Sequence, residues 1–216
     1  MFKIIKRIVL LIIGIIIFLV IKSHVSFEER TPSTNTEKNQ AKPSLEELLR
    51  VKADSARTFC VSKKYNTDYC ILIDFSIHSG KKRFFVWDFK GDSIKLSSLC
   101  AHGYGQNSTT KKPVFSNVEG SYCSSLGKYK IGIRSYSKWG INVHYKMHGL
   151  EKTNDNAYKR YVVLHSYEHV PERETYPIHL PLGMSQGCPV ISNNTMRSID
   201  ELLKTVEKPI LMWIYI

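Results

Sequence analysis

After residue 68 the chain carries a series of apolar, β-branched and aromatic runs, some of them alternating with polar residues, and this pattern predicts β-strands. The clearest runs are residues 70–75 and 83–89, which the turn Ser79-Gly80 joins into a predicted hairpin. Further strands are predicted at residues 93–101, 127–135, 140–149, 161–165 and 210–216. The pattern therefore predicts a mostly β body over residues 68–216, built as a sandwich or as a barrel-like sheet.

Two stretches have helical patterns instead. Ser44 and Glu47 have the spacing of a capping box, so a helix is expected to start there and to run through Ala53 or a little further. A second helix is expected over residues 195–207, capped by Asn193-Asn194. Its apolar face would consist of Met196, Ile199, Leu202, Leu203 and Val206. The expected fold class is therefore mostly β with one or two short helices.

The N-terminal residues combine a basic start with an apolar run. Lys3, Lys6 and Arg7 precede residues 8–21, which carry no charge, so this segment is expected to be an export signal or a membrane anchor. No Ala-x-Ala cleavage site follows, which favours an uncleaved membrane helix with its basic end in the cytoplasm. The expected organisation is an anchor or signal (1–25), a polar, flexible tether (26–43), a helical lead-in (44–67) and the body (68–216).

The net charge of the chain indicates which classes of binding partner to expect. With 31 basic and 19 acidic residues, the chain carries a net charge of +12, which favours a polyanionic neighbour such as a membrane surface, a wall polymer or nucleic acid. The lysines are scattered, and no recognition helix, zinc finger or aromatic RNA-binding motif accompanies them. Nucleic acid is therefore not an expected partner.

Five cysteines are present, and four of them are expected to be structural. Cys60, Cys70, Cys100 and Cys123 could pair in an exported protein, but their spacings match no known disulfide scaffold. We therefore favour four small buried hydrophobic residues over two disulfides, with the pairing left open. Cys188 stands apart from them.

Cys188 is the candidate nucleophile. It follows Ser185-Gln186-Gly187 in a predicted turn, and His165 ends the apolar run 161–165, 188 − 165 = 23 positions earlier. A histidine can take the proton of a thiol and later return it to a leaving amine. Because Pro189 has no N–H, any oxyanion donors in this loop must be the amides of Gly187 and Cys188, or groups elsewhere. By spacing alone, however, a lone cysteine is more often a buried small residue.

Other histidines and aromatic residues are weaker candidates. The pairs His144/His148 and His165/His169 have a spacing that suits zinc on a helix, but they lie in strand-like or turn-like sequence. We therefore expect no metal and no cofactor. The tyrosines and tryptophans near the strands are expected to belong to the core rather than to stack on sugars.

Several segments, in order along the chain, resemble one known family. Ser185-x-Gly187-Cys188, with His165 upstream at the end of an apolar strand, resembles the L,D-transpeptidase catalytic domain of the YkuD type, and most closely the branch in which proline follows Gly-Cys. The resemblance extends over roughly residues 70–216. It also includes residues 72–76, 79–83, 101–103, 116–117, 120, 125–127, 150–151 and 154–157.

The resemblance implies a mostly β catalytic fold and acyl transfer on peptidoglycan stem peptides. In that family the cysteine, here Cys188, attacks the carbonyl before a D-amino acid and expels it, and an amine from a second stem resolves the acyl-enzyme. His165 would act as base and then acid, oriented by the carbonyl of Ser166, with the amides of Gly187 and Cys188 as the oxyanion hole. The implied substrate contacts are His102, Ser185 and Gln186. For His102, a structural hydrogen-bonding role is the alternative.

The chain departs from the family pattern beside the two reactive residues. Ser166 stands where glycine is usual, Pro189 where arginine is most common, and Gln186 where the proline branch has an aromatic residue. These changes leave Cys188 and His165 in place.

Three other functions remain alternatives to the transpeptidase. They are an L,D-carboxypeptidase, which hydrolyses the same bond, a non-catalytic peptidoglycan-binding module of the same fold, and a zinc hydrolase. Together with the N-terminal segment, the resemblance implies a location on the periplasmic side of the bacterial inner membrane, or secretion into the periplasm.

Overall fold

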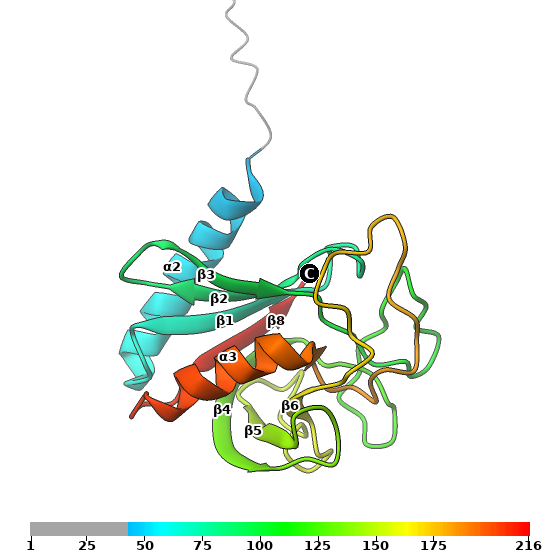
Figure 1. Cartoon of the computed structure of the whole chain (residues 1–216). Helices are drawn as coiled ribbons and strands as arrows, with labels where there is room; N and C mark the ends of the chain where they lie inside the picture. The colour runs from blue at the N-terminus through cyan, green and yellow to red at the C-terminus, as the bar shows by residue number, and fades with distance from the viewer. Residues whose placement is uncertain (1–42) are drawn as a thin grey trace, which may run out of the picture. The chain divides into compact units, whose positions relative to one another are not determined.

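Residues 43–216 of the chain are described by a computed structural model (Figure 1). The predicted anchor (1–25) and the tether, except for Pro43, lie outside the described residues. Within residues 43–216, no helix is both long and apolar enough to cross a membrane. The elements are α2 (Leu45–Lys63), β1 (Tyr69–Asp74), β2 (Phe84–Asp88), β3 (Ser93–Ser98), β4 (Gly127–Tyr136), β5 (Val143–Gly149), β6 (Val163–Ser166), β7 (Val190–Ile191), α3 (Asn193–Lys204) and β8 (Leu211–Tyr215).

All strands form one eight-stranded sheet in the order β3-β2-β1-β8-β4-β5-β6-β7. The predicted hairpin is confirmed, because β1 and β2 pair antiparallel with Ile71 opposite Val86. The C-terminal strand β8 lies in the middle of the sheet, parallel to β1 and antiparallel to β4. Every strand predicted from the sequence is present, whereas β7 was not predicted because two residues are too short to show a pattern.

The two ends of the sheet meet just beyond β3 and at β7. Ala101 and Val190 form a β-bridge, in which the amide of Ala101 donates to the carbonyl of Val190 at 2.8 Å. The fold is therefore mostly β and barrel-like, as predicted. Val190 is two residues after Cys188, so this closure also anchors the loop that carries the candidate nucleophile.

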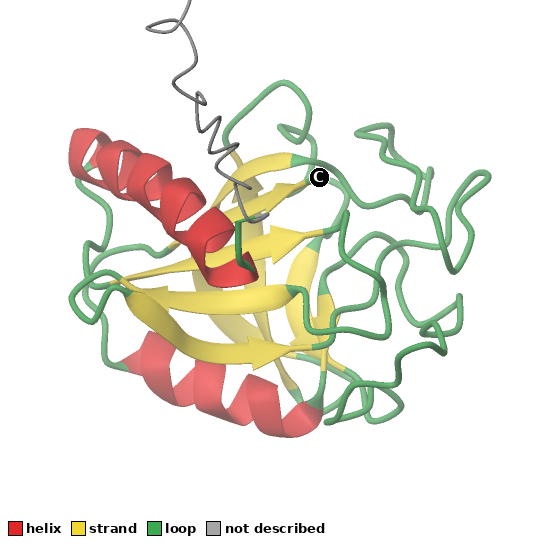
Figure 2. Ribbon diagram, turned by 90° about the horizontal axis from the view of Figure 1, so that it is seen from above, coloured by secondary structure: helices red, strands yellow, loops and turns green. Residues whose placement is uncertain are grey.

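Both faces of the central strands are buried, each against one helix. In β1, Ile71 and Ile73 face one core with α3, while Cys70 and Leu72 face a second core with α2. Figure 2 shows the two helices on opposite sides of the strands. Successive residues of a strand point to opposite faces, which explains why the run 70–75 is almost continuously apolar.

Helix α2 starts as predicted and continues further. Ser44 Oγ accepts from the amide of Glu47 at 3.2 Å, and the Glu47 carboxylate accepts from the amide of Ser44 at 2.6 Å, which completes the capping box. The helix then runs to Lys63, ten residues beyond Ala53. Its buried stripe consists of Leu49, Ala53, Ala56 and Cys60. Because these apolar residues are small and isolated, the sequence indicated only weakly that the helix continues. Packing against the sheet stabilises the additional turns.

The N-cap of α3 is Ser192, not Asn193 or Asn194 as predicted. Ser192 has an extended backbone, and its side chain accepts from the amide of Thr195. It directly follows β7, so the strand sets where the helix begins. The predicted apolar face is confirmed, with Met196 and Ile199 buried and the other three residues packed against the core. The helix ends at Lys204, before the predicted residue 207.

The five cysteines are all free, and Cys60, Cys70, Cys100 and Cys123 are buried. Cys60 and Cys70 lie in the core under α2, and Cys100 lies in the core under α3. Their places match the prediction of small hydrophobic core residues rather than of disulfide partners.

Arg83 is a buried cation that joins three segments. Its exposed fraction is 1%, and its guanidinium donates to the carbonyls of Cys100 (2.8 Å) and Ile77 (3.3 Å) and to Nδ1 of His102 (2.9 Å). The ring of Phe75 lies 4.8 Å from the guanidinium carbon. Burial lowers the pKa of Arg83 to about 10, so it remains charged at neutral pH.

We expect Arg83→Met to lower the free energy of unfolding by about 3 kcal/mol or more, because the buried Cys100 carbonyl and His102 ring and the part-buried Ile77 carbonyl lose their donor. Urea unfolding of the whole chain measures the change. The matched control is Arg50→Met, which removes an exposed ion pair with Asp92 and is expected to cost less than about 1 kcal/mol. Equal losses in the two variants would contradict the structural role of Arg83.

Candidate active site

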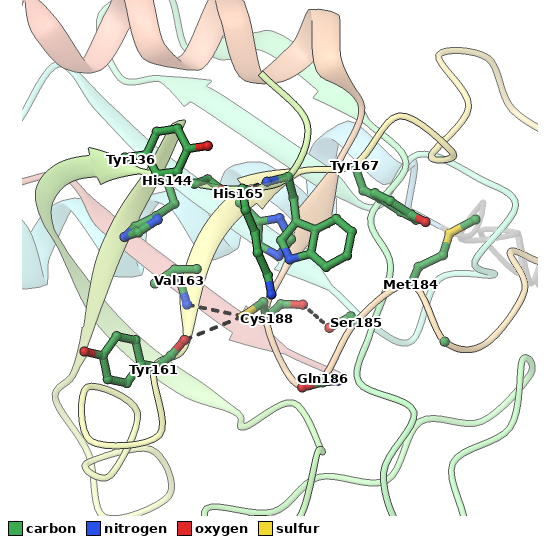
Figure 3. A pocket seen from close by; sticks show the side chains of 14 residues that line it. Tyr136, His144, Tyr161, Val163, His165, Tyr167, Met184, Ser185, Gln186 and Cys188 are labelled. Atoms are coloured by element: carbon green, nitrogen blue, oxygen red, sulfur yellow. Dashed lines mark hydrogen bonds between the residues drawn. The ribbon is translucent and has the colours of Figure 1, made fainter. Parts of the chain in front are cut away.

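Cys188 and His165 line the same cleft, although they come from separate parts of the chain (Figure 3). Strands β6 and β7 pair in parallel with His165 opposite Val190, which brings the residues before Val190 beside the start of β6. The cleft has a volume of about 480 Å³. It is lined by the nucleophile loop, residues 183–188, by residues 136–139, and by Tyr161 and Tyr167.

His165 has a defined tautomer. Its Nδ1 lies 2.9 Å from the carbonyl of Ser166, and since a carbonyl only accepts, Nδ1 carries the proton and donates. The lone pair is then on Nε2, where a base needs it. Burial lowers the pKa of His165, so the imidazole is neutral at neutral pH. The acceptor of this hydrogen bond, the carbonyl of Ser166, is the group to which the resemblance gives the orienting role.

The Cys188 thiol is half-buried beside the start of β6. Its Sγ lies 3.4 Å from the amide nitrogen of Val163 and 3.9 Å from the carbonyl oxygen of Tyr161. Burial raises the pKa of Cys188, and the Val163 amide and the charges of Arg160 and Lys146 oppose that rise. A raised pKa leaves the thiol protonated at neutral pH, so a nearby base is needed to form the thiolate.

The hydroxyl of Ser185 shapes the nucleophile loop. It donates to the carbonyl of Cys188 and accepts from the amide of Gly187 at 3.0 Å. Ser185 is buried, so the hydroxyl expected to contact substrate is used within the loop. The Gly187 amide, which was expected to be one of the two oxyanion donors, is therefore already hydrogen-bonded to Ser185 Oγ. Gln186, in contrast, is exposed at the cleft and free to meet a ligand.

Gly187 has to be glycine for two reasons. Its φ of +111° lies in a region that side chains rarely adopt, and a Cβ there would lie 2.6 Å from the carbonyl oxygen of Cys123. That carbonyl accepts from Arg160, whose guanidinium also donates to Ser116 and Ser125. Arg160 therefore holds the segment against which the nucleophile loop packs. Its partners lie 35 to 44 positions away along the chain, so the sequence offered no signal for this role.

His102 lies outside the cleft. It is buried, its Nδ1 accepts from Arg83 at 2.9 Å, and its Nε2 donates to the carbonyl of Thr109 at 3.0 Å. Burial and the charge of Arg83 lower the pKa of His102 to about 4. Both ring nitrogens are therefore used in holding the long loop after β3, which corresponds to the structural alternative for this residue.

The histidine pairs do not form a metal site among the described residues. His144 and His148 lie on β5, where positions four apart are separated by about 13 Å, too far to share one ion. His144 lies in the wall of the cleft, and His148 stacks on Tyr158. Within residues 43–216, no group of three histidine, cysteine or acidic side chains is placed to hold a metal.

Three aromatic residues at the cleft were not predicted to be there. Core packing was expected, and Trp87 and Tyr129 are indeed buried. Tyr136, Trp139 and Tyr161 are instead exposed and line the cleft. Tyr136 ends β4, Trp139 lies in the turn that follows it, and Tyr161, the first residue of the predicted strand 161–165, lies before β6, so all three are at or beyond strand ends rather than in the core.

The similarity to known proteins extends over nearly all of the described residues. A family model described as "L,D-transpeptidase catalytic domain" matches residues 44–215. No curated protein matches the sequence. Two solved structures of the helical cell shape determining protein Pgp2 from Campylobacter jejuni, one of them a mutant, are 12% identical, with TM-scores of 0.45 and 0.43. Each aligns with 73% of this chain, which spans 53% and 54% of the Campylobacter chains.

An L,D-transpeptidase structure from Xylanimonas cellulosilytica is also similar, at 10% identity and a TM-score of 0.36. The alignment covers 73% of this chain and 68% of that one.

Proposed function

Because the chain belongs to the L,D-transpeptidase catalytic domain family, we propose that it is a cysteine acyltransferase acting on peptidoglycan stem peptides. Membership supports a peptidoglycan-related function, and Pro189 suggests the branch with proline after Gly-Cys. The observation that carries the proposed mechanism is the shared cleft of Cys188 and His165, in which Ser166 leaves Nε2 of His165 unprotonated.

The first half-reaction forms a thioester. Nε2 of neutral His165 takes the thiol proton, and Sγ of Cys188 attacks the carbonyl carbon between an L-centre and the following D-amino acid. The tetrahedral intermediate collapses as protonated His165 gives its proton to the leaving amine. The D-amino acid departs, and the rest of the stem stays on Cys188 as an acyl group.

The oxyanion of that intermediate needs donors. We assign them to the amides of Gly187 and Cys188, at the tip of the nucleophile loop. The Gly187 amide is bonded to Ser185 Oγ, so it becomes a donor to the oxyanion only when that bond opens. Gln186, exposed beside these amides, contacts the stem.

The second half-reaction regenerates the thiol. An amine from a second stem attacks the thioester, His165 accepts its proton, and the thiolate leaves and is reprotonated. The product is a cross-link between two stems. Attack by water instead would make the protein an L,D-carboxypeptidase.

The test is to incubate the protein with tetrapeptide muropeptides and to identify the products by mass. We expect release of a D-amino acid together with cross-linked dimers, unchanged by a chelator because no metal takes part. Release without dimers would show the carboxypeptidase instead. Binding of muropeptides with no product would identify a non-catalytic module, and loss of activity with chelator would identify a zinc hydrolase.

The location follows from the same proposal. We assign residues 1–25 to a membrane anchor or signal and residues 26–43 to a tether, which place the body in the periplasm. Added protease should then digest the body in spheroplasts whose inner membrane is intact. Protection until the membrane is lysed would contradict this location.

A further inference from the structure

We propose that Tyr136, Trp139 and Tyr161, called here the aromatic rim, bind the glycan part of the cell wall by stacking on its sugar rings. The inference rests on the proposed function, because it adds a glycan contact to a site that acts on the stem peptide. The rim lines the cleft that contains Cys188. In Figure 3, Tyr136 and Tyr161 lie on one side of Cys188, and Tyr167 and Met184 on the other.

The exposure of the rim is the first argument. Tyr136 is 74% exposed, Tyr161 73% and Trp139 46%, whereas the core residue Tyr129 is 0% exposed. Large aromatic side chains stabilise a fold by burial, so these three contribute little to folding as they stand. A cluster of exposed rings at a cleft marks a binding surface.

Tyr161 adds a backbone argument. Its φ of 57° is left-handed, a conformation that is costly for a bulky residue and favours glycine or asparagine. Because the ring is exposed, its burial does little to offset the cost of this conformation. Its carbonyl lies 3.9 Å from Sγ of Cys188, so the strained turn holds the ring beside the nucleophile.

The turn that carries Trp139 favours a sugar over a peptide strand. The amide of Ser137 donates to the carbonyl of Asn142, the amide of Asn142 donates to the carbonyl of Trp139, and the side chain of Asn142 donates to the carbonyl of Ser137. The amide of Trp139 donates to Ser137 Oγ. These groups are therefore not available to pair with a peptide, and the turn offers a ring face instead.

The same turn is held rigidly. The amide of Ile141 donates to Ser166 Oγ at 3.1 Å, and Gly140 packs so closely that a Cβ would lie 2.4 Å from the Ser166 carbonyl oxygen. The Trp139 ring meets Tyr167 edge-on, with centroids 5.6 Å apart. A platform that is already ordered loses little entropy on binding.

Charge complements the aromatic surface. Lys146 Nζ lies 3.7 Å from the ring centroid of Tyr161, and Lys138 Nζ lies 5.3 Å from that of Trp139. None of the residues that line the cleft is acidic. A ligand with apolar sugar faces and nearby carboxylates fits this surface, and peptidoglycan carries both, on its glycan and on its stems.

The experiment compares glycan binding in rim and control variants. The protein is titrated with peptide-free glycan strands, and the change in Trp139 fluorescence is the signal. The Trp139→Phe variant tests whether this signal comes from Trp139. We expect Tyr136→Ala and Tyr161→Asn to weaken binding roughly 10-fold. The matched control is Tyr122→Asn, which removes another exposed tyrosine with a left-handed φ of 54°, outside the cleft, and should bind as the wild type does.

A kinetic comparison separates this inference from the proposed function. The wild type should have a lower KM for a disaccharide tetrapeptide than for the sugar-free tetrapeptide, and in the rim variants this KM ratio should fall toward one. Circular dichroism confirms that each variant is folded. Glycan that fails to bind, or that binds wild type and rim variants equally, would overturn the inference even if both substrates react. Rim-dependent glycan binding without turnover would instead leave the inference standing and remove the proposed reaction.

Discussion

Replacing Cys188 with alanine should reduce release of the D-amino acid by at least about 10³-fold, because the proposed acyl-enzyme forms on this thiol. The cleft residues include no second cysteine, and Ser185 is buried with its hydroxyl bonded within the loop. Intact-protein mass after incubation with a stem tetrapeptide gives a second measurement. The wild type should gain the mass of the acyl group, and Cys188→Ala should gain none.

Cys60→Ala is the matched control for this prediction. Cys60 is fully buried in the core under α2, and burial raises its pKa to about 11, so it should neither be acylated nor be required for turnover. Equal product from Cys188→Ala and the wild type would exclude the proposed nucleophile. If Cys60→Ala also lost activity while still folded, then loss of activity on replacing a cysteine would not identify the nucleophile.

His165→Gln should lower kcat/KM by about 10²- to 10⁴-fold, because the thiol is protonated at neutral pH and depends on this base. Glutamine keeps a polar side chain of similar length but cannot take a proton. His169→Gln is the control, since His169 is exposed on the loop after β6 and is not part of the cleft lining. Equal effects of the two substitutions would argue against a specific role for His165.

The pH profile of the wild type tests the same residues. Burial lowers the pKa of His165, so the imidazole remains neutral to more acidic pH and the acidic limb of kcat/KM should lie below about pH 6.5. Burial also raises the pKa of Cys188, so the alkaline limb should lie above about pH 8.5. The acidic limb should disappear in His165→Gln. A limb that persists unchanged there would assign the titration to another group.

Local patterns were sufficient for most of the fold. The runs 70–75 and 83–89 are almost continuously apolar, β-branched or aromatic, which is typical of strands buried on both faces, so they were visible without any partner. The capping box of Ser44 and Glu47 is equally local. The ten additional residues of α2 were not, because Ala56 and Cys60 are helical through contact with the sheet rather than through their own pattern.

Within the site, the residue types in the sequence singled out the thiol and the imidazole, and the family pattern placed the Ser166 carbonyl beside the imidazole. The hydrogen-bond partners came only from the tertiary structure. The Gly187 amide and the Ser185 hydroxyl bond to each other, and His102 bonds to Arg83 and Thr109, away from the cleft. Residue types show that these groups can donate or accept, but not which partner occupies them.

The sequence by itself therefore determined the mostly β body, the starting residue of α2 and the family of the chain, because each depends on residue order or on the two-residue period of a strand. Only the tertiary structure decided that Ala101 and Val190 close the sheet beside Cys188 and that Tyr136, Trp139 and Tyr161 form an exposed rim there. The physical reason is that burial and pairing depend on neighbours distant in the chain, and a local pattern does not specify them.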